Sequence, residues 1–209
     1  MRAVDSSEGQ AGQQRRTQAE RSEATRLLLV NTGRRLFTEQ GFAGTSTEAL
    51  VREAGVTRGA LYHHYNGKRE LFQAVFEQVE REIVEQVVAA VAGAADDFER
   101  AWRIGIEAFL DGCMDPAAQR IVLLDAPSVL GWDKWREIDS AYFLGLIVAL
   151  FEQGMAAGVF ARRPAQPIAQ MAMGALTEAA LSIARAPDVA AARAEFGAAA
   201  MHLIEGLKS

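Results

Sequence analysis

Hydroxyl and basic side chains gather in one short stretch of the chain, between Thr45 and Lys68. Thr45-Ser46-Thr47-Glu48 has the form of a capping box, in which the Thr45 hydroxyl covers the Glu48 amide at the start of a helix. Gly55 ends this short helix, and Thr57 is suited to be the N-cap of a second one. Two short capped helices around a tight turn predict a helix-turn-helix, which presents its second helix to the major groove of DNA.

The polar residues of this stretch divide into positioning and reading groups. Thr45, Ser46 and Thr57 are expected at helix N-termini, where hydroxyls, free amides and the helix dipole favour a phosphate. Arg58 can offer a bidentate fork to guanine, and Gly59 beside it lets the backbone approach the duplex closely. The hydroxyls would therefore position the module, and Arg58 and Gly59 would read the sequence.

Four further residues complete the expected DNA-binding set. Tyr62 and His63 follow one turn later, where a phenol or imidazole can donate to phosphate or pack against a thymine methyl. His64 either contacts the DNA backbone or is simply exposed, and Lys68 adds a charge for the phosphates. A helical hairpin used for protein contact is the alternative interpretation. Capping, turn chemistry and local charge agree on DNA.

The charge of the chain is unevenly distributed. The 209 residues carry a net charge of -5, which argues against nucleic-acid binding over the whole surface. From Arg15 to Phe72 there are ten Lys/Arg against six Asp/Glu, whereas Gln73 to Ser209 carries eleven against nineteen. A basic N-terminal third on an acidic body fits a chain with one end that faces a polyanion, and chance clustering of solvated charges is the alternative.

The order and spacing of these residues resemble the TetR family of bacterial regulators over about Arg21 to Phe76. The segments that carry the resemblance are Gly41-Phe42, Thr45-Ser46, Ala54 to Tyr65 and Lys68 to Leu71. It implies an N-terminal DNA-binding domain and supports the roles of Tyr62, His63 and Lys68. The departures from the usual pattern, at Arg34, Ala49, Val51 and Tyr65, remove no proposed phosphate contact and bear on which operator is bound.

Apolar residues recur at helical spacing almost everywhere, so the chain is predicted to be all-α, with about nine helices. We expect a disordered tail over 1–17, a helix-turn-helix domain over 18–66, a connecting helix over 67–92, and an effector-binding and dimerisation domain over 93–209. Later helices are expected at about 96–114, 116–126, 133–157, 167–186 and 188–207, with a broken apolar loop at 125–132.

The last two helices are expected to form a homodimer through Gln166 to Leu207, as the resemblance implies. This segment is rich in alanine, which permits close helix approach, although an ordinary buried helix pair has a similar composition. One short recognition helix makes few base contacts, whereas a two-fold dimer reads two half-sites of a pseudo-palindromic operator roughly 34 to 36 Å apart, or a multiple of that distance. Double-stranded DNA and a second copy of the chain are therefore the predicted partners.

The resemblance also implies an effector pocket for a small apolar or amphipathic molecule in the C-terminal domain. Aromatic and methionine residues suited to line it are Trp102, Phe109, Trp132, Trp135, Tyr142 and Met171. The alternative is plain core, and the Trp132 and Trp135 region beside the broken loop ranks first. Asp125, Asp133, Glu137 and Asp139 form a local acidic cluster that could attract a cation or a cationic ligand, but we interpret it as helix-stabilising.

The sequence shows no constellation typical of an enzyme, a cofactor site or a metal site. The single cysteine, Cys113, fits a reducing cytoplasm, and the polar first fourteen residues resemble neither a signal peptide nor an anchor. No apolar run reaches the roughly 20 residues of a membrane span. The prediction is a cytoplasmic, ligand-responsive homodimeric repressor; the alternatives are a non-sensing architectural DNA binder and an enzyme on the same fold.

Overall fold

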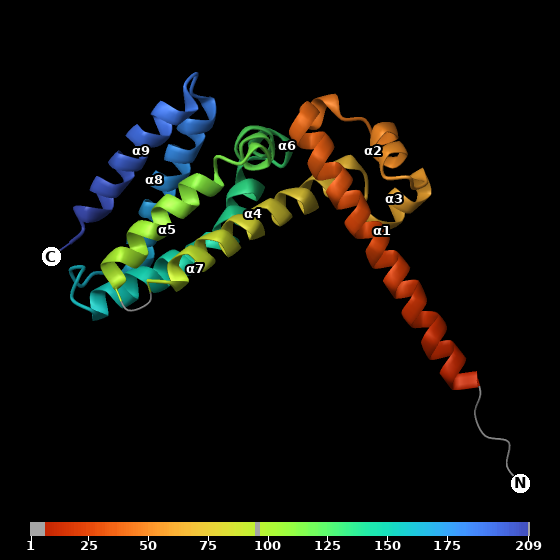
Figure 1. The fold of residues 1–209 in the computed structure, drawn as a ribbon, viewed down its shortest axis with the longest axis horizontal. Helices are drawn as coiled ribbons and strands as arrows, with labels where there is room; N and C mark the ends of the chain where they lie inside the picture. Colours follow the sequence, from red (N-terminus) through yellow and green to blue (C-terminus); the bar gives the residue numbers. More distant parts are fainter. Residues whose placement is uncertain (1–6, 95–96, 209) are drawn as a thin grey trace, which may run out of the picture. The chain divides into compact units, whose positions relative to one another are not determined.

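A computed structural model describes residues 7–94 and 97–208, with side chains from residue 18 onward, and Figure 1 labels its elements. The described residues form nine α-helices and one π-helix, and their β-type pairing is limited to an isolated bridge between Phe160 and Lys208. The all-α class is confirmed. The chain divides into two compact units, the N-terminal unit (Met1–Val75) and the C-terminal unit (Phe76–Ser209).

The first helix, α1 (Ser7–Gly44), is longer than the sequence predicts. It is helical from Ser7, where a disordered tail is expected over 1–17, and residues 1–6 of that tail lie outside the described residues. No proline occurs between Ser7 and Gly41, so the backbone can remain helical. Gly41 adopts φ 71° and ψ 171°, a conformation that suits glycine, and the regular helix ends there as predicted.

The N-terminal unit continues with two short helices and the start of a long one. They are α2 (Thr47–Glu53), α3 (Arg58–His64) and α4 (Lys68–Ala92). Gly55, with φ 64°, makes the turn between α2 and α3, and Gly67, with φ 98°, precedes α4. Both conformations favour glycine because a Cβ is strained at such positive φ values. The predicted pair of short helices around a tight turn is confirmed.

Apolar side chains on three helices hold the N-terminal unit together. Leu29, Val30, Leu36 and Phe37 of α1 are buried, and Leu61 of α3 is fully buried against this layer. Phe72, on the second turn of α4, lies edge-on to Phe37 with ring centroids 5.1 Å apart. Burying each of these side chains stabilises the unit by roughly 1.5–3 kcal/mol, which fixes α3 on its scaffold.

The C-terminal unit contains the rest of α4 and the later helices. They are α5 (Phe98–Gly112), the π-helix η1 (Ala118–Asp125), α6 (Ala126–Val129), α7 (Trp132–Ala156), α8 (Ala165–Arg185) and α9 (Val189–Glu205). The cap of α5 is Asp97, whose carboxylate accepts from the Arg100 amide at 3.0 Å, and the expected cap, Asp96, lies outside the described residues.

The segment around Pro127 is helical, which corrects the predicted broken loop. The helix that starts after Asp115 widens into η1 and passes into α6, with Pro127 inside α6. In η1 the Ala126 amide donates to the Ile121 carbonyl, five residues earlier. A proline ring normally clashes with the carbonyl four residues before it, and the wider turn relieves this clash. The chain breaks at Gly131, where φ is 89°.

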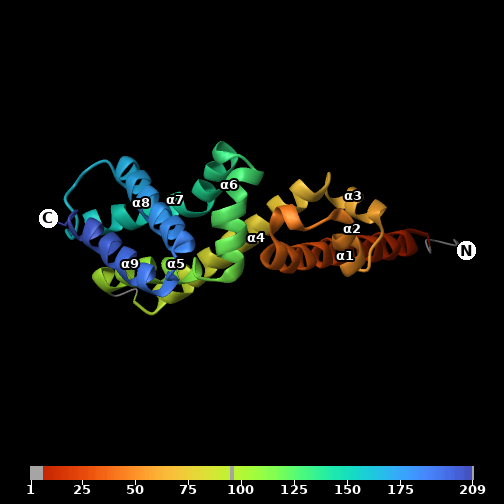
Figure 2. The ribbon, with the colours of Figure 1, turned by 90° about the horizontal axis from the view of Figure 1, so that it is seen from above.

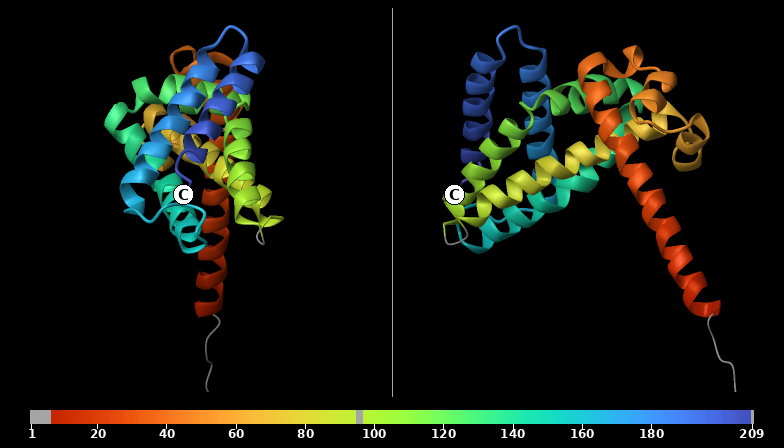
Figure 3. Two further views of the ribbon diagram at one scale, coloured as in Figure 1. Left: turned by 90° about the vertical axis from the view of Figure 1, so that its left-hand side faces the viewer. Right: turned by 45° about the vertical axis from the view of Figure 1, so that its right-hand side comes forward.

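Helices α7, α8 and α9 pack in sequence, with α8 against both of its neighbours and α5 against α9. Figures 2 and 3 show α8 and α9 side by side, joined by a short connection. The core of the C-terminal unit includes the fully buried side chains of Trp102, Leu110, Phe151 and Ile183. Gly154 lies against the rings of Phe98 and Phe160, so a side chain there would meet both rings.

Helix α7 is the one helix of the described chain that is long and apolar enough, by length and composition, to cross a membrane. The sequence predicts no such segment, because the few charges of α7 interrupt its apolar runs. Trp135, Ile138, Phe143 and Phe151 of α7 are buried within the C-terminal unit. The core helix of a helical domain meets the same criteria as a membrane span.

Candidate DNA-binding face and ligand cavity

The two short helices of the N-terminal unit are capped by hydroxyl side chains. Ser46 Oγ accepts from the Ala49 amide at 3.0 Å, and Thr57 Oγ1 accepts from the Ala60 amide at 3.1 Å. A hydroxyl that accepts in a cap keeps its own proton for a second partner. Ser46 and Thr57 are both exposed, so each can donate that proton outward beside the positive end of a helix.

Thr45 does not cap α2, which corrects the predicted capping box. Its side chain is buried, and its hydroxyl donates to the carbonyls of Gly41 at 2.8 Å and Leu36 at 3.2 Å. The cap shifts by one residue to Ser46, because Thr45 turns inward to satisfy the carbonyls exposed where α1 ends at Gly41. Thr45 therefore stabilises the turn and is inaccessible to a phosphate.

Lys68 has a role in the fold of the N-terminal unit. Its Nζ donates to the carbonyls of Phe42 at 2.8 Å and Thr45 at 2.7 Å, and it lies 4.1 Å from the centroid of the Phe42 ring. Desolvation by burial lowers the pKa of Lys68. The first residue of α4 thus ties that helix to the corner between α1 and α2.

The exposed residues of α3 form a polar face, defined here as Arg58, Gly59, Tyr62 and His63. The Arg58 guanidinium lies 5.6 Å from the centroid of the Tyr62 ring and 3.3 Å from a Glu48 carboxylate oxygen. The Arg58 and Glu48 side chains are each more than 60% exposed, so this ion pair is weak and can be exchanged for a DNA contact.

Two predicted positions beside this face need separate description. A Cβ at Gly59 would have no heavy atom of the protein within 3.4 Å, so the protein itself does not require glycine at this position. The missing side chain instead leaves space on the surface of α3, into which a DNA backbone can approach closely. His64 is half-buried, with its ring edge-on to that of His63 at 5.1 Å. The exposed His63 is therefore the better placed of the two histidines to reach a partner.

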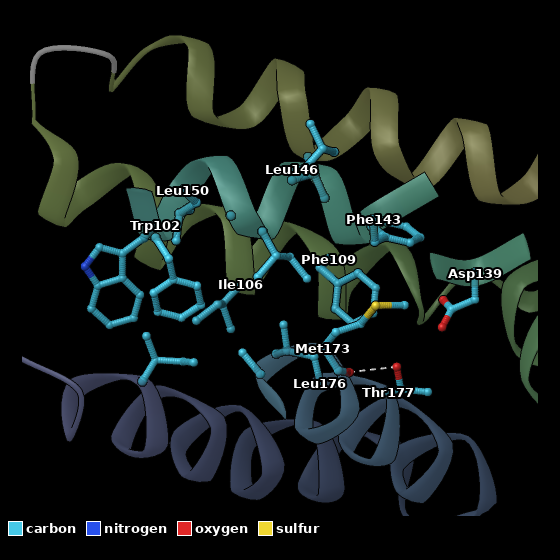
Figure 4. A pocket seen from close by; sticks show the side chains of 16 residues that line it. Trp102, Ile106, Phe109, Asp139, Phe143, Leu146, Leu150, Met173, Leu176 and Thr177 are labelled. Atoms are coloured by element: carbon cyan, nitrogen blue, oxygen red, sulfur yellow. Dashed lines mark hydrogen bonds between the residues drawn. The ribbon is translucent and has the colours of Figure 1, made fainter. Parts of the chain in front are cut away.

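The C-terminal unit contains an apolar cavity of about 110 Å³ between α4, α5, α7, α8 and α9. Figure 4 shows its lining, with Trp102 at one end and Asp139 near Thr177 at the other. Apolar cavities of about 150 Å³ bind a benzene ring, so this volume suits a ligand with one aromatic ring. It is below the roughly 300 to 1,000 Å³ typical of ligand sites.

The six aromatic and methionine residues predicted for the pocket fall into three groups. Trp102 and Phe109 line the cavity, and Trp135 lines a smaller one beside it. Tyr142 lines neither of the two cavities, and Trp132 and Met171 are 57% and 76% exposed. Helical spacing alone does not identify the inward face of α7 or α8, because both faces of each helix carry apolar residues.

The smaller cavity holds buried polar groups, among them Glu80, which sequence reasoning missed, and Asp139, which it had interpreted only as helix-stabilising. Glu80 of α4 is 1% exposed, and desolvation raises its pKa well above the usual value, with the charge of Asp139 adding to the shift. Burial raises the pKa of Asp139 to about 6, and Arg136 opposes this shift. Burial also raises the pKa of the Cys113 thiol, which therefore stays protonated and unreactive at neutral pH. A signal for Glu80 exists in the sequence, since it lies in the apolar stripe of Phe76, Val79 and Ile83.

Comparison with protein families identifies both parts of the chain. Residues 29–75 match a model described as "Bacterial regulatory proteins, tetR family", and residues 100–207 match one described as "Tetracyclin repressor-like, C-terminal domain". The second match covers about half of the chain. The chain belongs to the TetR family.

Individual members of the TetR family show the same relationship. The chain is 28% identical over 136 residues to the transposon Tn10 TetC protein of Escherichia coli, covering 64% of this chain and 66% of that protein. It is 32% identical over 106 residues to the regulator SrpR of Pseudomonas putida, covering 51% of this chain and 47% of SrpR. The chain thus spans about half to two thirds of the length of these curated relatives.

A solved structure extends the similarity over nearly the whole chain. A TetR-family transcriptional regulator from Pectobacterium atrosepticum is 38% identical, with a TM-score of 0.79, and the match covers 90% of this chain and 96% of that one. The helix-turn-helix followed by a helical bundle is therefore the TetR-family fold in this chain. SrpR and the Pectobacterium atrosepticum protein are both transcriptional regulators.

Proposed function

We propose that this chain is a cytoplasmic, homodimeric repressor that binds a pseudo-palindromic operator and is released from it by a small-molecule effector. The observation that carries the proposal is the exposed face of α3, where Arg58 follows the Thr57 cap directly and Tyr62 lies one turn after Arg58. Arg58 reads guanine and Gly59 admits the duplex backbone. Ser46, Thr57, Tyr62 and His63 donate to phosphates, and His64 supports His63 from the rear of the helix.

Dimerisation is proposed through α8 and α9. Met171 on α8 and Leu203 on α9 are 76% and 61% exposed, although both are large and apolar. Ala198 and Ala199 on α9 are exposed as well, and such small side chains allow two helices to approach closely. Covering these side chains in a two-fold interface would remove them from water and place two α3 helices in one complex.

Helix α4 is the proposed coupling element between effector and DNA. Its residues Glu80, Ile83 and Val87 line the two cavities, and its first residue, Lys68, holds the corner between α1 and α2. The helix is continuous between these points, without glycine or proline. An effector that prefers the cavity shape of the DNA-free state would therefore shift α4 and weaken operator binding.

The test begins with selection of the operator from genomic fragments, followed by fluorescence anisotropy with the selected duplex. We expect two chains per operator and about a tenfold or greater loss of selectivity over random DNA in Arg58→Ala. The matched control is Arg52→Ala, since Arg52 is 70% exposed on α2 outside the α3 face. One chain per operator, or equal effects of the two changes, would contradict the proposal.

Release by an effector needs its own test, a metabolite screen against the operator complex. A repressor of this kind loses operator affinity with at least one small molecule, whereas an architectural DNA binder responds to none. Leu203→Asp provides the test of the interface, because a carboxylate buried in an apolar interface strongly disfavours association. Sedimentation should show a monomer for this variant, and an unchanged dimer would rule out the α8–α9 interface.

A further inference from the structure

The two cavities of the C-terminal unit are adjacent and share part of their lining. Phe109, Asp139 and Thr177 line both of them. The larger part, here called the apolar lobe, is lined almost wholly by hydrocarbon. The smaller part, here called the polar lobe, has Glu80 and Asp139 in its wall. A molecule that occupies both lobes therefore meets hydrocarbon at one end and two carboxyl groups at the other.

Glu80 leaves hydrogen-bonding capacity open in the polar lobe. Its Oε1 atom is buried and has no hydrogen-bond partner within the described part of the chain, and the same holds for the Nε1 atom of Trp135 across the same lobe. A buried polar atom without a partner costs roughly 1–3 kcal/mol by itself, so such atoms usually face a ligand or a water molecule. These two atoms mark the polar lobe as the place where a polar group binds.

The polar lobe contains more negative than positive groups. Among the described residues, no Lys, Arg or His lines either lobe. The nearest cation is Arg136, whose Nη1 lies 3.4 Å from Asp139 Oδ2 at a partly exposed site, and this contact leaves Glu80 unpaired. Arg193 of α9 forms ion pairs with Glu107 and Asp111 and does not line the polar lobe.

The remaining polar groups of the lobe carry no charge. From α5, Cys113 contributes a protonated thiol. From α8, the Thr177 hydroxyl donates to the Met173 carbonyl at 2.8 Å and so offers only its lone pairs to a guest. Every polar side chain around the lobe except Trp135 therefore presents acceptor capacity, which suits a guest that donates hydrogen bonds.

Building on the function proposed above, we propose that the effector is a small arylalkyl ammonium ion. Its single ring lies in the apolar lobe, and its ammonium group lies where the two lobes share Asp139 and donates to Asp139 and Glu80. The polar lobe, of about 10 Å³, has room for about one group of the size of a water molecule. The volume of about 110 Å³ limits the apolar part to about one ring. The ammonium supplies the positive charge that Glu80 lacks, since buried charges are stable only when they are paired.

A proton balance follows from this pairing. Burial and the charge of Asp139 favour the protonated form of Glu80 in the empty site, whereas burial raises the pKa of Asp139 only to about 6, so at pH 7 Glu80 is the group that holds a proton. A bound ammonium favours their carboxylate forms, so its binding expels protons to the solvent. A neutral guest of the same shape leaves the protons in place. Proton release therefore separates ionic recognition from simple filling of the cavity.

The experiment uses calorimetry on the full chain with 2-phenylethylamine and with 2-phenylethanol, which share the ring and differ in the charged head. At pH 7 we expect the amine to bind about 10- to 100-fold more tightly than the alcohol, the range for a charged hydrogen bond. Repeating the titration in buffers of different ionisation enthalpy should show proton release for the amine alone. Glu80→Gln should remove most of the preference for the amine.

Glu85→Gln is the matched control, because Glu85 lies on the same helix and is exposed. Asp139→Asn is a second variant, which changes the other carboxyl group of the polar lobe. Proton release by the wild-type chain tests the ammonium proposal even if neither variant folds. Equal binding of amine and alcohol, binding of neither, or an amine preference unchanged in Glu80→Gln would overturn the proposal. If the chain binds its operator and is released by a metabolite that is not an ammonium ion, the proposed function stands and only the proposed effector class is wrong.

Discussion

Lys68→Met offers the sharpest test of how the N-terminal unit is built. The change keeps most of the hydrocarbon stem of Lys68 and removes its ammonium, which donates to the carbonyls of Phe42 and Thr45 at 2.8 and 2.7 Å. A hydrogen bond to a charged group contributes roughly 1.5–3 kcal/mol, and part of the sum is offset because a buried ammonium is no longer desolvated. We expect the free energy of opening α2 and α3 to fall by about 2–4 kcal/mol.

Amide hydrogen exchange followed by mass spectrometry measures this opening directly. A loss of this size should speed exchange of the α2 and α3 amides by about 30- to 1,000-fold, since each 1.4 kcal/mol is a factor of ten. All three tryptophans, Trp102, Trp132 and Trp135, lie in the C-terminal unit, so its unfolding can be followed separately by fluorescence. That transition should be unchanged.

Salt dependence of operator binding distinguishes this role from a phosphate contact. A lysine that neutralises a phosphate contributes about one unit to the slope of log affinity against log salt. Because the Lys68 ammonium is already bound to two carbonyls, we expect Lys68→Met to leave this slope unchanged. Normal exchange of α2 and α3 together with a slope reduced by about one would refute the reasoning.

Three further outcomes are expected. Gly154→Ala should destabilise the C-terminal unit by about 1–3 kcal/mol in urea unfolding, because its methyl group would overlap the rings of Phe98 and Phe160; a neutral result would contradict the packing. Burial raises the pKa of Asp139 to about 6, so the folded state binds a proton that the unfolded state releases near pH 4, and stability should fall as pH rises from 4 to 6. Asp139→Asn should reduce this loss by about 2 kcal/mol, measured as the difference in unfolding free energy between pH 4.5 and 7.5. Protonation of Glu80 accounts for the part of the loss that remains. Arg58→Ala should lower the slope of operator affinity against salt by no more than one while relaxing base selectivity, so a uniform loss on all sequences would argue against base reading.

Local chemistry allowed the helix-turn-helix to be predicted from the sequence. The N-cap role of Thr57, the turn at Gly55 and the break at Gly41 depend on backbone conformations and on contacts within a few residues. Such preferences are encoded in short segments, and they also place Arg58 in the first turn of α3. The TetR family was recognisable for the same reason, since its resemblance lies in this segment.

Only the tertiary structure decided which of two adjacent hydroxyl groups faces outward and which carbonyl groups the Lys68 ammonium contacts. Thr45 and Ser46 are adjacent and chemically alike, and only the position of the α1 carbonyls turns Thr45 inward and leaves Ser46 as the cap. Lys68 reaches Phe42 across 26 residues, a pairing that no local pattern contains.

In the C-terminal unit, the sequence by itself determined the all-α class and the approximate helices. Which aromatic residues line the cavity was decided by the tertiary structure, because α7 and α8 carry apolar residues on more than one face. Trp102 was brought to the cavity, and Met171 was left exposed. Glu80 and Asp139 lie 59 positions apart, and only the packing of α4 against the rest of the unit encloses both in one polar lobe. Helical periodicity identifies an apolar stripe, whereas burial of a charge depends on what the rest of the chain places over it.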